Sequence, residues 1–344
     1  MKIGLVGYQG SGKSTLFEWL TGVAADPSLA HKDQSAMAPV PEPRLEALAE
    51  IYHPKKISRA ALEIVDTPGL HRTHEGNAAR LALIREAGCL VLVVPAFDRS
   101  DTAAELRSFE EDLTLADMEI VAGRIERVEQ TLEKPLPRQE REQLAHEEET
   151  LKVVLSAMEA GEPLRRSDLT EEQLMVTRSF RLLSEKPRMV LVNTSDDEEH
   201  PERFTALVPE GIPAVAVPVG LESELARMSP EERAEFEEEM GVGGTDRDQL
   251  IRTIMDASGQ MLFLTAGPKE VRSWILRQGG TAVEAAGAIH TDLARGFIRA
   301  EVFKVADLVR TGSEREAKAQ HLVRQEPKDY VVQDDDVLLI RFSV

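Results

Sequence analysis

A glycine-rich motif near the N-terminus contains the residues best suited to chemistry. Residues 7–14 follow the pattern G-x-x-x-x-G-K-S, between an apolar run at 3–6 and an amphipathic segment from Leu16 onward. A strand, a glycine turn and a helix in this order favour polyphosphate binding, because backbone N–H groups and the helix dipole face the anion. A glycine turn with a solvated lysine is the alternative. The residues expected to bind nucleotide here are Gly7, Gly10, Ser11, Gly12, Lys13, Ser14 and Thr15.

A second motif, D-x-x-G, spans Asp66 to Gly69 and follows an apolar strand predicted at 61–66. Alone the pattern is weak, since it occurs in many turns, but its place after a strand and fifty residues beyond the first motif strengthens it. Asp66 is expected to hold a Mg²⁺ together with the Ser14 hydroxyl. Lys13 and the Gly69 N–H are the expected catalytic groups, because both would face the γ-phosphate.

A third motif follows a strand predicted at 189–192. In P-loop GTPases an N-K-x-D sequence at this place reads guanine, and this chain has Asn193, Thr194 and Asp196, with threonine where lysine is expected. The three residues are the candidate base-binding group. The alternative is an Asx turn that caps the next helix. A further strand predicted at 214–219 leads into residues 220–225, the last loop expected to border the base.

Composition and charge exclude several classes of protein. With 344 residues the chain should form two or three domains, and 42% hydrophobic and 30% charged residues are typical of a soluble globular protein. The single cysteine excludes a disulfide framework, and no apolar run approaches the ~20 residues that span a bilayer, so we expect a cytoplasmic protein without membrane contact. The net charge of −20 argues against indiscriminate nucleic-acid binding. Residues 263–344 are neutral, so the whole excess lies before them.

The remaining elements follow from periodicity. Residues 89–95 are apolar throughout and predict a central parallel strand. Residues 98–185 lack strand patterns and predict an antiparallel helical hairpin broken at 134–137, with either a solvated or a partner-binding charged face. Its two apolar seams are Met118, Val121, Ile125, Val128 and Leu132, and Leu144, Leu151, Leu155 and Met158.

Two further stretches are less regular. Residues 24–60 predict a loop around one short helix at 44–52, with Ser28 and Ser35 as the hydroxyls nearest the place where nucleotide switches offer a threonine to Mg²⁺. The C-terminal 80 residues predict strands at 260–265 and 297–304, and a hairpin of 330–332 with 337–342. Trp274 and Phe297 belong either to a core or to an RNA-stacking surface.

Together these stretches resemble the YchF / Obg-like ATPase family over essentially the whole chain. The resemblance rests on the phosphate loop, the D-x-x-G motif, the helical hairpin and several further segments: 39–45, 75–77, 225–241, 263–274, 286–292, 295–301 and 328–330. It implies an α/β fold, with a Ras-like P-loop NTPase sheet, a helical coiled-coil insertion and a C-terminal β-grasp-like TGS domain. The implied domains are 1–98 with 186–262 for nucleotide binding, 99–185 for the insertion and 263–344 for TGS.

The family resemblance also implies function. It predicts a Mg²⁺-dependent monomer that binds ATP in preference to GTP and associates with the ribosome or translation machinery through the insertion and the TGS domain. A hydrolysis-deficient adaptor and a GTP-specific GTPase are alternatives. A P-loop kinase is disfavoured, because it would leave the second and third motifs unused.

Departures from the family, together with a hydrophobic residue that the family shares at position 70, predict slow hydrolysis. The phosphate loop differs from the usual N-V-G-K-S-T, Ala30 or His31 falls near the switch threonine, and the loop at 97–101 lacks the family's histidine. Leu70 stands where Ras-like switches have a glutamine that orients the attacking water. A leucine offers no donor or acceptor, so intrinsic turnover should fall well below ~1 s⁻¹.

Overall fold

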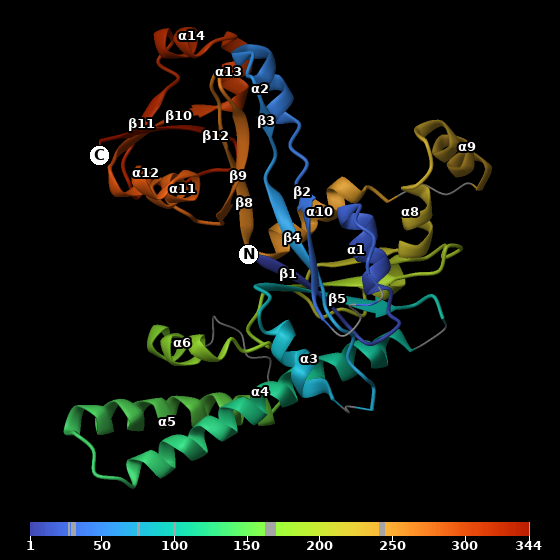
Figure 1. The fold of residues 1–344 in the computed structure, drawn as a ribbon, viewed down its shortest axis with the longest axis vertical. Helices are drawn as coiled ribbons and strands as arrows, with labels where there is room; N and C mark the ends of the chain where they lie inside the picture. Colours follow the sequence, from blue (N-terminus) through green and yellow to red (C-terminus); the bar gives the residue numbers. More distant parts are fainter. Residues whose placement is uncertain are drawn as a thin grey trace. The chain divides into compact units, whose positions relative to one another are not determined.

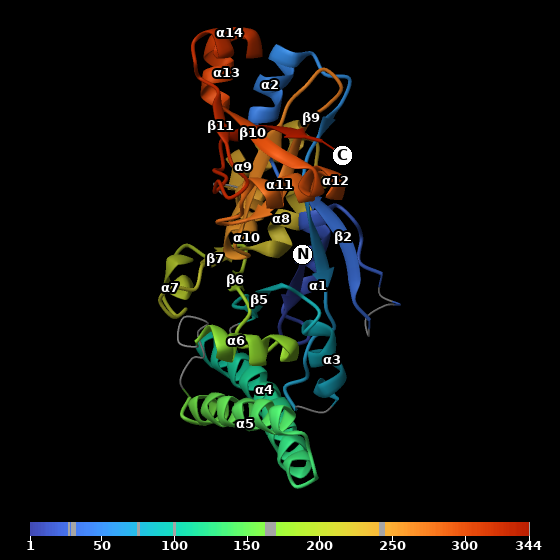
Figure 2. The ribbon, with the colours of Figure 1, turned by 90° about the vertical axis from the view of Figure 1, so that its left-hand side faces the viewer.

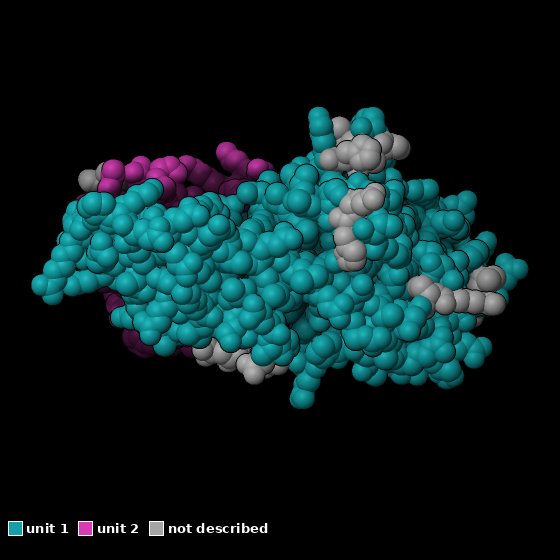
Figure 3. All heavy atoms as spheres, turned by 90° about the horizontal axis from the view of Figure 1, so that it is seen from below, with its two compact units in different colours: residues 1–36, 64–245 teal, residues 37–63, 246–344 magenta. Residues whose placement is uncertain are grey.

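The computed structural model describes residues 1–26, 28, 32–73, 76–98, 101–161, 170–240 and 245–343. The chain forms two compact units, which Figure 3 distinguishes by colour. The first comprises residues 1–36 and 64–245, and the second residues 37–63 and 246–344. Within the described part of the chain, no helix combines the length and apolar character needed to cross a membrane.

One sheet, whose strands β1, β5, β6 and β7 lie wholly in the first unit, has the strand order β2-β4-β1-β5-β6-β7 (Figure 1). Strands β1, β5, β6 and β7 pair in parallel, with Leu5 opposite Val91 and Val91 opposite Met189. Every residue of β5 is buried, because a parallel sheet is covered on both faces. The predicted central strand is therefore confirmed. The bounds are β1 (Lys2–Val6), β2 (Gln34–Pro39), β4 (Ala61–Asp66), β5 (Cys89–Pro95), β6 (Arg188–Asn193) and β7 (Ala214–Val217).

One apolar cluster joins this sheet to three helices. Ile84 of α3 (Asn77–Ile84), Phe109 of α4 (Thr102–Leu132) and Phe204 of α7 (Glu202–Thr205) pack against Leu92 of β5 and its neighbours. The D-x-x-G segment and the phosphate loop contribute to the same core through Leu70 and Tyr8. The other helices of the unit are α1 (Lys13–Thr21), α5 (Arg138–Glu159), α6 (Glu171–Thr177), α8 (Val219–Leu225) and α9 (Pro230–Met240).

The predicted helical hairpin is formed by α4 and α5, which lie side by side in both views (Figures 1 and 2). Val121, Ile125 and Leu151 are buried in its core as the seams predict. Val154, which the second seam omits, is fully buried, whereas Leu155 is only partly buried. Residues three and four positions apart both lie on one helix face, so the apolar spacing alone did not decide whether Val154 or Leu155 is the buried residue.

Two short strands in the first sixty residues were not predicted. The helix predicted at 44–52 is α2 (Arg44–Tyr52), but β2 and β3 (Ile57–Ser58) occupy parts of the predicted loop. Both are edge strands of their sheets, where prolines and polar residues are tolerated, so neither carries a hydrophobic alternation. Ser35 lies on β2. Ala30 and His31, the positions nearest the switch threonine, fall outside the described residues.

The sheet of the second unit has the order β11-β10-β12-β8-β9-β3. β10 pairs antiparallel with β12, and β8 pairs antiparallel with β9 and parallel with β12. Its remaining strands are β8 (Gln260–Thr265), β9 (Val271–Arg277), β10 (Phe297–Lys304), β11 (Arg324–Glu326) and β12 (Asp336–Phe342). Besides α2, its helices are α10 (Arg247–Ala257), α11 (Ala282–Ile289), α12 (Thr291–Arg295), α13 (Val305–Thr311) and α14 (Glu314–Ala319).

The two aromatic side chains that were candidates for RNA stacking belong to the core of this unit. Trp274 is partly buried, stacks on Phe263 with ring centroids 6.4 Å apart, and donates from Nε1 to Thr265 Oγ1 at 2.9 Å. Phe297 packs against the same cluster. Both rings are partly buried against this core cluster, which favours the core role over an RNA-stacking surface.

Two predictions in the later part of the chain were wrong, one about a strand pairing and one about a loop. Residues 330–332 do not form a hairpin with β12; instead Val331 bridges to Thr281 and the Val332 N–H donates to Gly280. Both edges of β12 are already taken by β10 and β8. The segment at 220–225, predicted as a loop, is helix α8, because β7 ends at Val217 and Pro218 begins the helix.

Candidate nucleotide site

The phosphate loop connects β1 to α1, and its glycines are required by close approaches of the backbone. Gly7 has φ 149°, and a Cβ there would lie 2.5 Å from the Val93 carbonyl oxygen of β5. Gly12 has φ 99°, and its Cβ would lie 2.2 Å from Asn193 Nδ2. Any side chain at either position would therefore force neighbouring strands away from the loop. The loop also contains Gly10 at φ 84° and Ser11, which is fully buried.

Lys13, the first residue of α1, is only 5% exposed, which excludes the solvated-lysine alternative. Its Nζ donates to the Tyr8 carbonyl oxygen at 2.8 Å and lies 3.4 Å from Ser11 Oγ. Burial lowers the pKa of Lys13 to about 8; the charge of Asp66 opposes this shift, and those of Arg72 and Arg80 add to it. An ammonium destabilised in this way gains strongly from an anionic ligand.

Ser14 and Asp66 form the second contact of the site. Ser14 Oγ donates to Asp66 Oδ2 at 2.6 Å. Asp66 is 7% exposed, and its Oδ1 is buried without a hydrogen-bond partner among the described residues. Burial raises the pKa of Asp66, while the Ser14 hydrogen bond and the Lys13 charge lower it. A buried oxygen without a partner is costly unless it binds a ligand, so this pair fits a hard cation such as Mg²⁺.

Mg²⁺ normally takes one or two protein ligands and completes its shell with phosphate oxygens and water. The described residues include no cluster of three or more His, Cys, Asp or Glu side chains suited to a metal. A hydroxyl and a single carboxylate beside a phosphate loop therefore match the way this ion is held with a nucleotide. Thr15, the next residue of α1, is partly buried.

Gly69 lies directly against the phosphate loop. A Cβ at Gly69 would be 2.8 Å from Gln9 N and 2.9 Å from Lys13 Nζ. Leu70 fixes this contact through two backbone hydrogen bonds, donating to the Gly7 carbonyl at 3.1 Å and accepting from the Gln9 N–H at 3.0 Å. The D-x-x-G turn thus brings the Gly69 backbone close to the lysine that would bind phosphate.

The side chain of Leu70 is fully buried in the core between the sheet and α3 and α4. It therefore does not lie where a water-orienting glutamine would act. The sequence predicted this role for position 70 because Leu70 directly follows the D-x-x-G motif. Its backbone pairs with the phosphate loop, and this pairing directs the side chain into the core.

Asn193 joins two loops of the site. Its Nδ2 donates to the Ser11 carbonyl at 3.1 Å, and its Oδ1 accepts from the Val219 N–H at 3.1 Å. These contacts are distant in sequence, which is unlike a local Asx turn. Thr194 is buried and Asp196 is exposed. An exposed carboxylate at the end of β6 remains available to a ligand.

Three residues close to the site were missed by the motif search. Tyr8, inside the phosphate loop, donates its hydroxyl to Asp112 Oδ2 of α4 at 2.9 Å. Arg72 lies within 3.5 Å of the Gln9 carbonyl through Nη1, and Arg80 donates to the Gly69 carbonyl. Tyr8 stands at an unspecified x position of its motif, and Arg72 and Arg80 lie beyond the D-x-x-G motif, so the patterns did not single these residues out.

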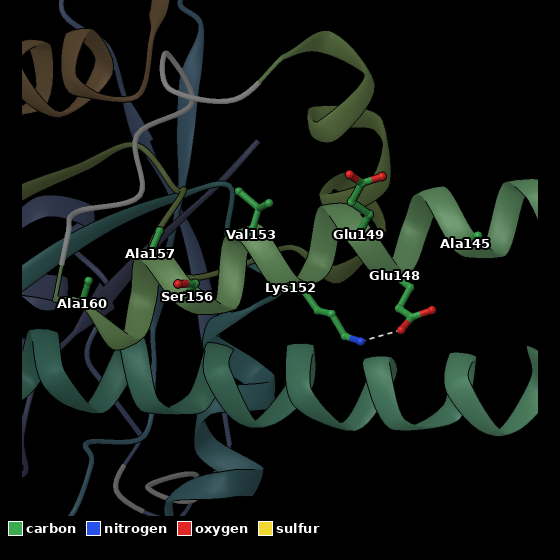
Figure 4. Close-up of a pocket in the computed structure, with 8 residues that line it drawn as sticks. All are labelled: Ala145, Glu148, Glu149, Lys152, Val153, Ser156, Ala157 and Ala160. Carbon is green, nitrogen blue, oxygen red and sulfur yellow. Dashed lines mark hydrogen bonds and ion pairs between the residues drawn. The ribbon is translucent and has the colours of Figure 1, made fainter.

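A separate hollow of about 760 Å³ lies on the helical hairpin (Figure 4). Lys152 at its edge pairs with Glu148 and with Glu129 of α4. None of the motif residues lines it, so it is not part of the nucleotide site. Its described lining comes from α5 and the residue that follows it: Ala145, Glu148, Glu149, Lys152, Val153, Ser156, Ala157 and Ala160.

Comparison with known proteins identifies the family. A family model described as a 50S ribosome-binding GTPase matches residues 2–124. A second model, for the C-terminal region of YchF GTPases and described as a protein of unknown function, matches residues 261–343. Both models cover parts of the chain that the sequence analysis assigned to the same family.

Similar proteins match over nearly the whole chain. The ribosome-binding ATPase YchF of Bacillus subtilis is 34% identical, with 99% of each chain covered. Obg-like ATPase 1 of Oryza sativa subsp. japonica is 34% identical over 100% of this chain and 92% of its own. The structure of the Schizosaccharomyces pombe YchF GTPase has a TM-score of 0.84 at 26% identity, covering 99% of this chain and 97% of that one. This chain therefore belongs to the YchF / Obg-like ATPase family.

Proposed function

We propose that this protein is a nucleotide-dependent switch that binds and slowly hydrolyses ATP with Mg²⁺ and associates with the ribosome. The observation that carries the proposal is the buried Lys13 beside the Ser14–Asp66 pair. The three side chains gather a cation, a hydroxyl and an unsatisfied carboxylate oxygen at the N-terminus of one helix. A Mg²⁺-polyphosphate complements each of them.

Each residue has a distinct role. Lys13 neutralises charge on the β- and γ-phosphates, and the loop amides with the Gly69 N–H bind their oxygens. Ser14 and Asp66 hold the metal, which when bound draws charge from the terminal phosphates. Asn193 keeps the phosphate loop and the loop before α8 in register through its two hydrogen bonds.

ATP is the proposed nucleotide, with GTP as the alternative. Relatives of this chain carry the name ATPase, and Thr194 stands where guanine-specific sites place a lysine on the base. Asp196 favours guanine, because a carboxylate accepts two hydrogen bonds from it. The proposed base-binding residues therefore favour only a modest preference for ATP over GTP.

Slow hydrolysis follows from the chemistry of the proposed site. Leu70 is buried and offers no hydrogen-bonding group to water, so Lys13, the loop amides and the metal stabilise charge without aligning a nucleophile. A partner that supplies such a group would raise the rate. A protein that binds nucleotide and hydrolyses none is the alternative from a different class.

The ribosome is the proposed partner, because relatives are named ribosome-binding. We assign the contact to the helical insertion, 99–185, and to a TGS domain at 263–344, with nucleotide binding in 1–98 and 186–262. A cytoplasmic monomer is the form in which the protein would act.

Single-turnover hydrolysis of ATP and GTP, with and without ribosomes, tests the proposal. Lys13→Ala should weaken nucleotide affinity about a hundredfold, because loss of a contact to a charged group costs a few kcal/mol. Lys186→Ala is a matched control, since Lys186 is also partly buried in the first unit and donates to the Arg85 and Ala87 carbonyls. Unchanged affinity in Lys13→Ala would reject the phosphate-loop assignment. Nucleotide binding without any hydrolysis would favour the adaptor.

A further inference from the structure

One face of α4 contacts the phosphate loop and the segment after D-x-x-G. Glu105, Phe109 and Asp112 are spaced four and three residues apart, which places them on one side of the helix. Tyr8 Oη donates to Asp112 Oδ2 at 2.9 Å, and the Tyr8 ring meets Phe109 edge-on with centroids 5.5 Å apart. We call Glu105, Phe109 and Asp112 the α4 contact face.

Tyr8 links this face to the phosphate-binding lysine. Its carbonyl oxygen accepts from Lys13 Nζ at 2.8 Å, while its hydroxyl is bound to Asp112. The side chains of Tyr8 and Asp112 are both buried, at 3% and 6% exposure. A shift of the loop that moves the Tyr8 backbone must therefore either break a buried hydrogen bond or move α4.

Arg72 forms a second link. Its guanidinium makes two hydrogen bonds to Glu105, at 2.7 and 3.0 Å, and lies over the Tyr8 ring at 5.2 Å. The Arg72 side chain is 50% exposed, and exposed ion pairs contribute little to stability. Removing a buried hydrogen-bond partner costs more, so the Tyr8–Asp112 bond is the stronger of the two links.

The same helix continues into the hairpin. Beyond the contact face, Val121 and Ile125 of α4 form the hairpin core with Leu151 of α5. Between these regions Asp117 is fully buried and accepts from the Leu183 and Ser184 N–H groups, which fixes the returning chain to α4. The segment from Asp112 to Leu132 extends about 30 Å at a rise of about 1.5 Å per residue.

We propose that Tyr8 and Asp112 are positioning residues that couple nucleotide binding at the phosphate loop to the conformation of α4 and its hairpin. The inference rests on the proposed function. A coupling of this kind is reciprocal, so whatever binds the hairpin and displaces α4 must also change nucleotide affinity. The hairpin and the nucleotide site thereby act on each other mainly through the Tyr8–Asp112 hydrogen bond and the Tyr8–Phe109 ring contact.

The test compares Tyr8→Phe, Asp112→Ala and Asp112→Asn in the full-length protein. Calorimetry with Mg-ADP and Mg-ATP measures affinity, and hydrogen exchange measures the response of residues 102–117 and of the phosphate loop. Tyr330→Phe is the matched control, because Tyr330 also donates to a buried aspartate, Asp336, at 2.8 Å, but in the second unit. Asp112→Asn keeps an acceptor for the Tyr8 hydroxyl and serves as the conservative variant.

In the wild type we expect nucleotide to change exchange in both the phosphate loop and α4. Tyr8→Phe and Asp112→Ala should weaken affinity about three- to tenfold, keep the response of the loop and lose that of α4. The effect of the double variant should be smaller than the sum of the two single effects, since both substitutions remove the same bond. Asp112→Asn should keep part of the α4 response, and Tyr330→Phe all of it.

An α4 response of wild-type size in Tyr8→Phe, or no α4 response in a wild type whose loop does respond, would overturn the inference. Tyr8→Phe changes no shape in the core, so it decides the matter even if Asp112→Ala fails to fold. A wild type that binds no nucleotide would overturn the proposed function itself and this inference with it. The two failures are distinguished by the wild-type calorimetry.

Discussion

Ser14 Oγ and Asp66 Oδ2 are 2.6 Å apart although 52 residues separate them in sequence. Parallel pairing places the ends of neighbouring strands at one edge of a sheet, and β4 lies next to β1. The hydroxyl satisfies one oxygen of Asp66 and leaves the other, Oδ1, buried without a partner. Burial raises the pKa of Asp66, whereas the Ser14 hydrogen bond and the Lys13 charge lower it, so a bound cation would remove an energetic cost of this buried carboxyl group.

Asp66→Asn should abolish the dependence of nucleotide affinity on Mg²⁺. The amide keeps the size of the side chain but removes the negative charge that binds the metal. We expect the wild type to bind ADP at least tenfold more tightly with Mg²⁺ than with EDTA, and the variant to bind equally in both. Because burial raises the pKa of Asp66, the variant should be at least as stable as the wild type at pH 7. A retained Mg²⁺ effect would show that the metal binds elsewhere.

The lowered pKa of Lys13 predicts opposite pH effects on binding and stability. In the folded protein this pKa is about 8, against 10.5 ordinarily, so between these values the unfolded chain binds more protons. Folding stability should therefore rise with pH across this window, by up to about 3 kcal/mol from this group. Nucleotide affinity should fall above pH 8, about tenfold by about pH 9, because phosphate needs the ammonium.

Calorimetry and urea unfolding between pH 6.5 and 9.5 measure these two effects. Lys13→Arg keeps its positive charge over this pH range and should therefore remove the pH dependence of both the nucleotide affinity and the folding stability. Lys13→Met should raise the free energy of unfolding at pH 7 by about 1–3 kcal/mol, since it removes a buried charge. A wild-type affinity that stays constant to pH 9.5 is incompatible with a lowered pKa at Lys13.

Leu70→Gln should destabilise the protein without restoring catalysis. The side chain is fully buried, so a glutamine there would bury an amide and lose apolar contacts, at a cost of about 2–4 kcal/mol. Chemical unfolding and single-turnover hydrolysis measure the two outcomes, with Leu70→Met as the volume-conserving control. A stable Leu70→Gln protein with a tenfold higher rate would show that the side chain reaches the γ-phosphate after all.

Asp196, which is exposed and lies three residues after β6, is the residue that we propose discriminates between the bases. Asp196→Ala should weaken GTP binding about tenfold and change ATP affinity less than threefold, because only guanine donates two hydrogen bonds to the carboxylate. Asp197→Ala, at the neighbouring exposed position, is the control. Competition binding in the wild type that favours GTP by tenfold or more would reverse the proposed preference for ATP.

The sequence by itself determined the local elements of the site. The glycine turn between β1 and α1, the apolar strand β5 and the polar residues after β6 were all predictable, because each depends on contacts within a few residues or on burial of a continuous apolar run. The sequence was weaker at sheet edges. β2 and β3 were missed and residues 330–332 were paired wrongly, since an edge strand carries no hydrophobic pattern that would specify its partner.

Only the tertiary structure decided where the side chains point at positions that the motifs leave unspecified or that directly follow a motif. The backbone of Leu70 pairs with Gly7 and Gln9, which sends its side chain into the core instead of toward the phosphates. Tyr8 reaches Asp112, 104 residues away. A motif fixes the residues whose backbone or charge meets the ligand, whereas the orientation of the residues between them is set by packing against helices that fold from distant parts of the chain.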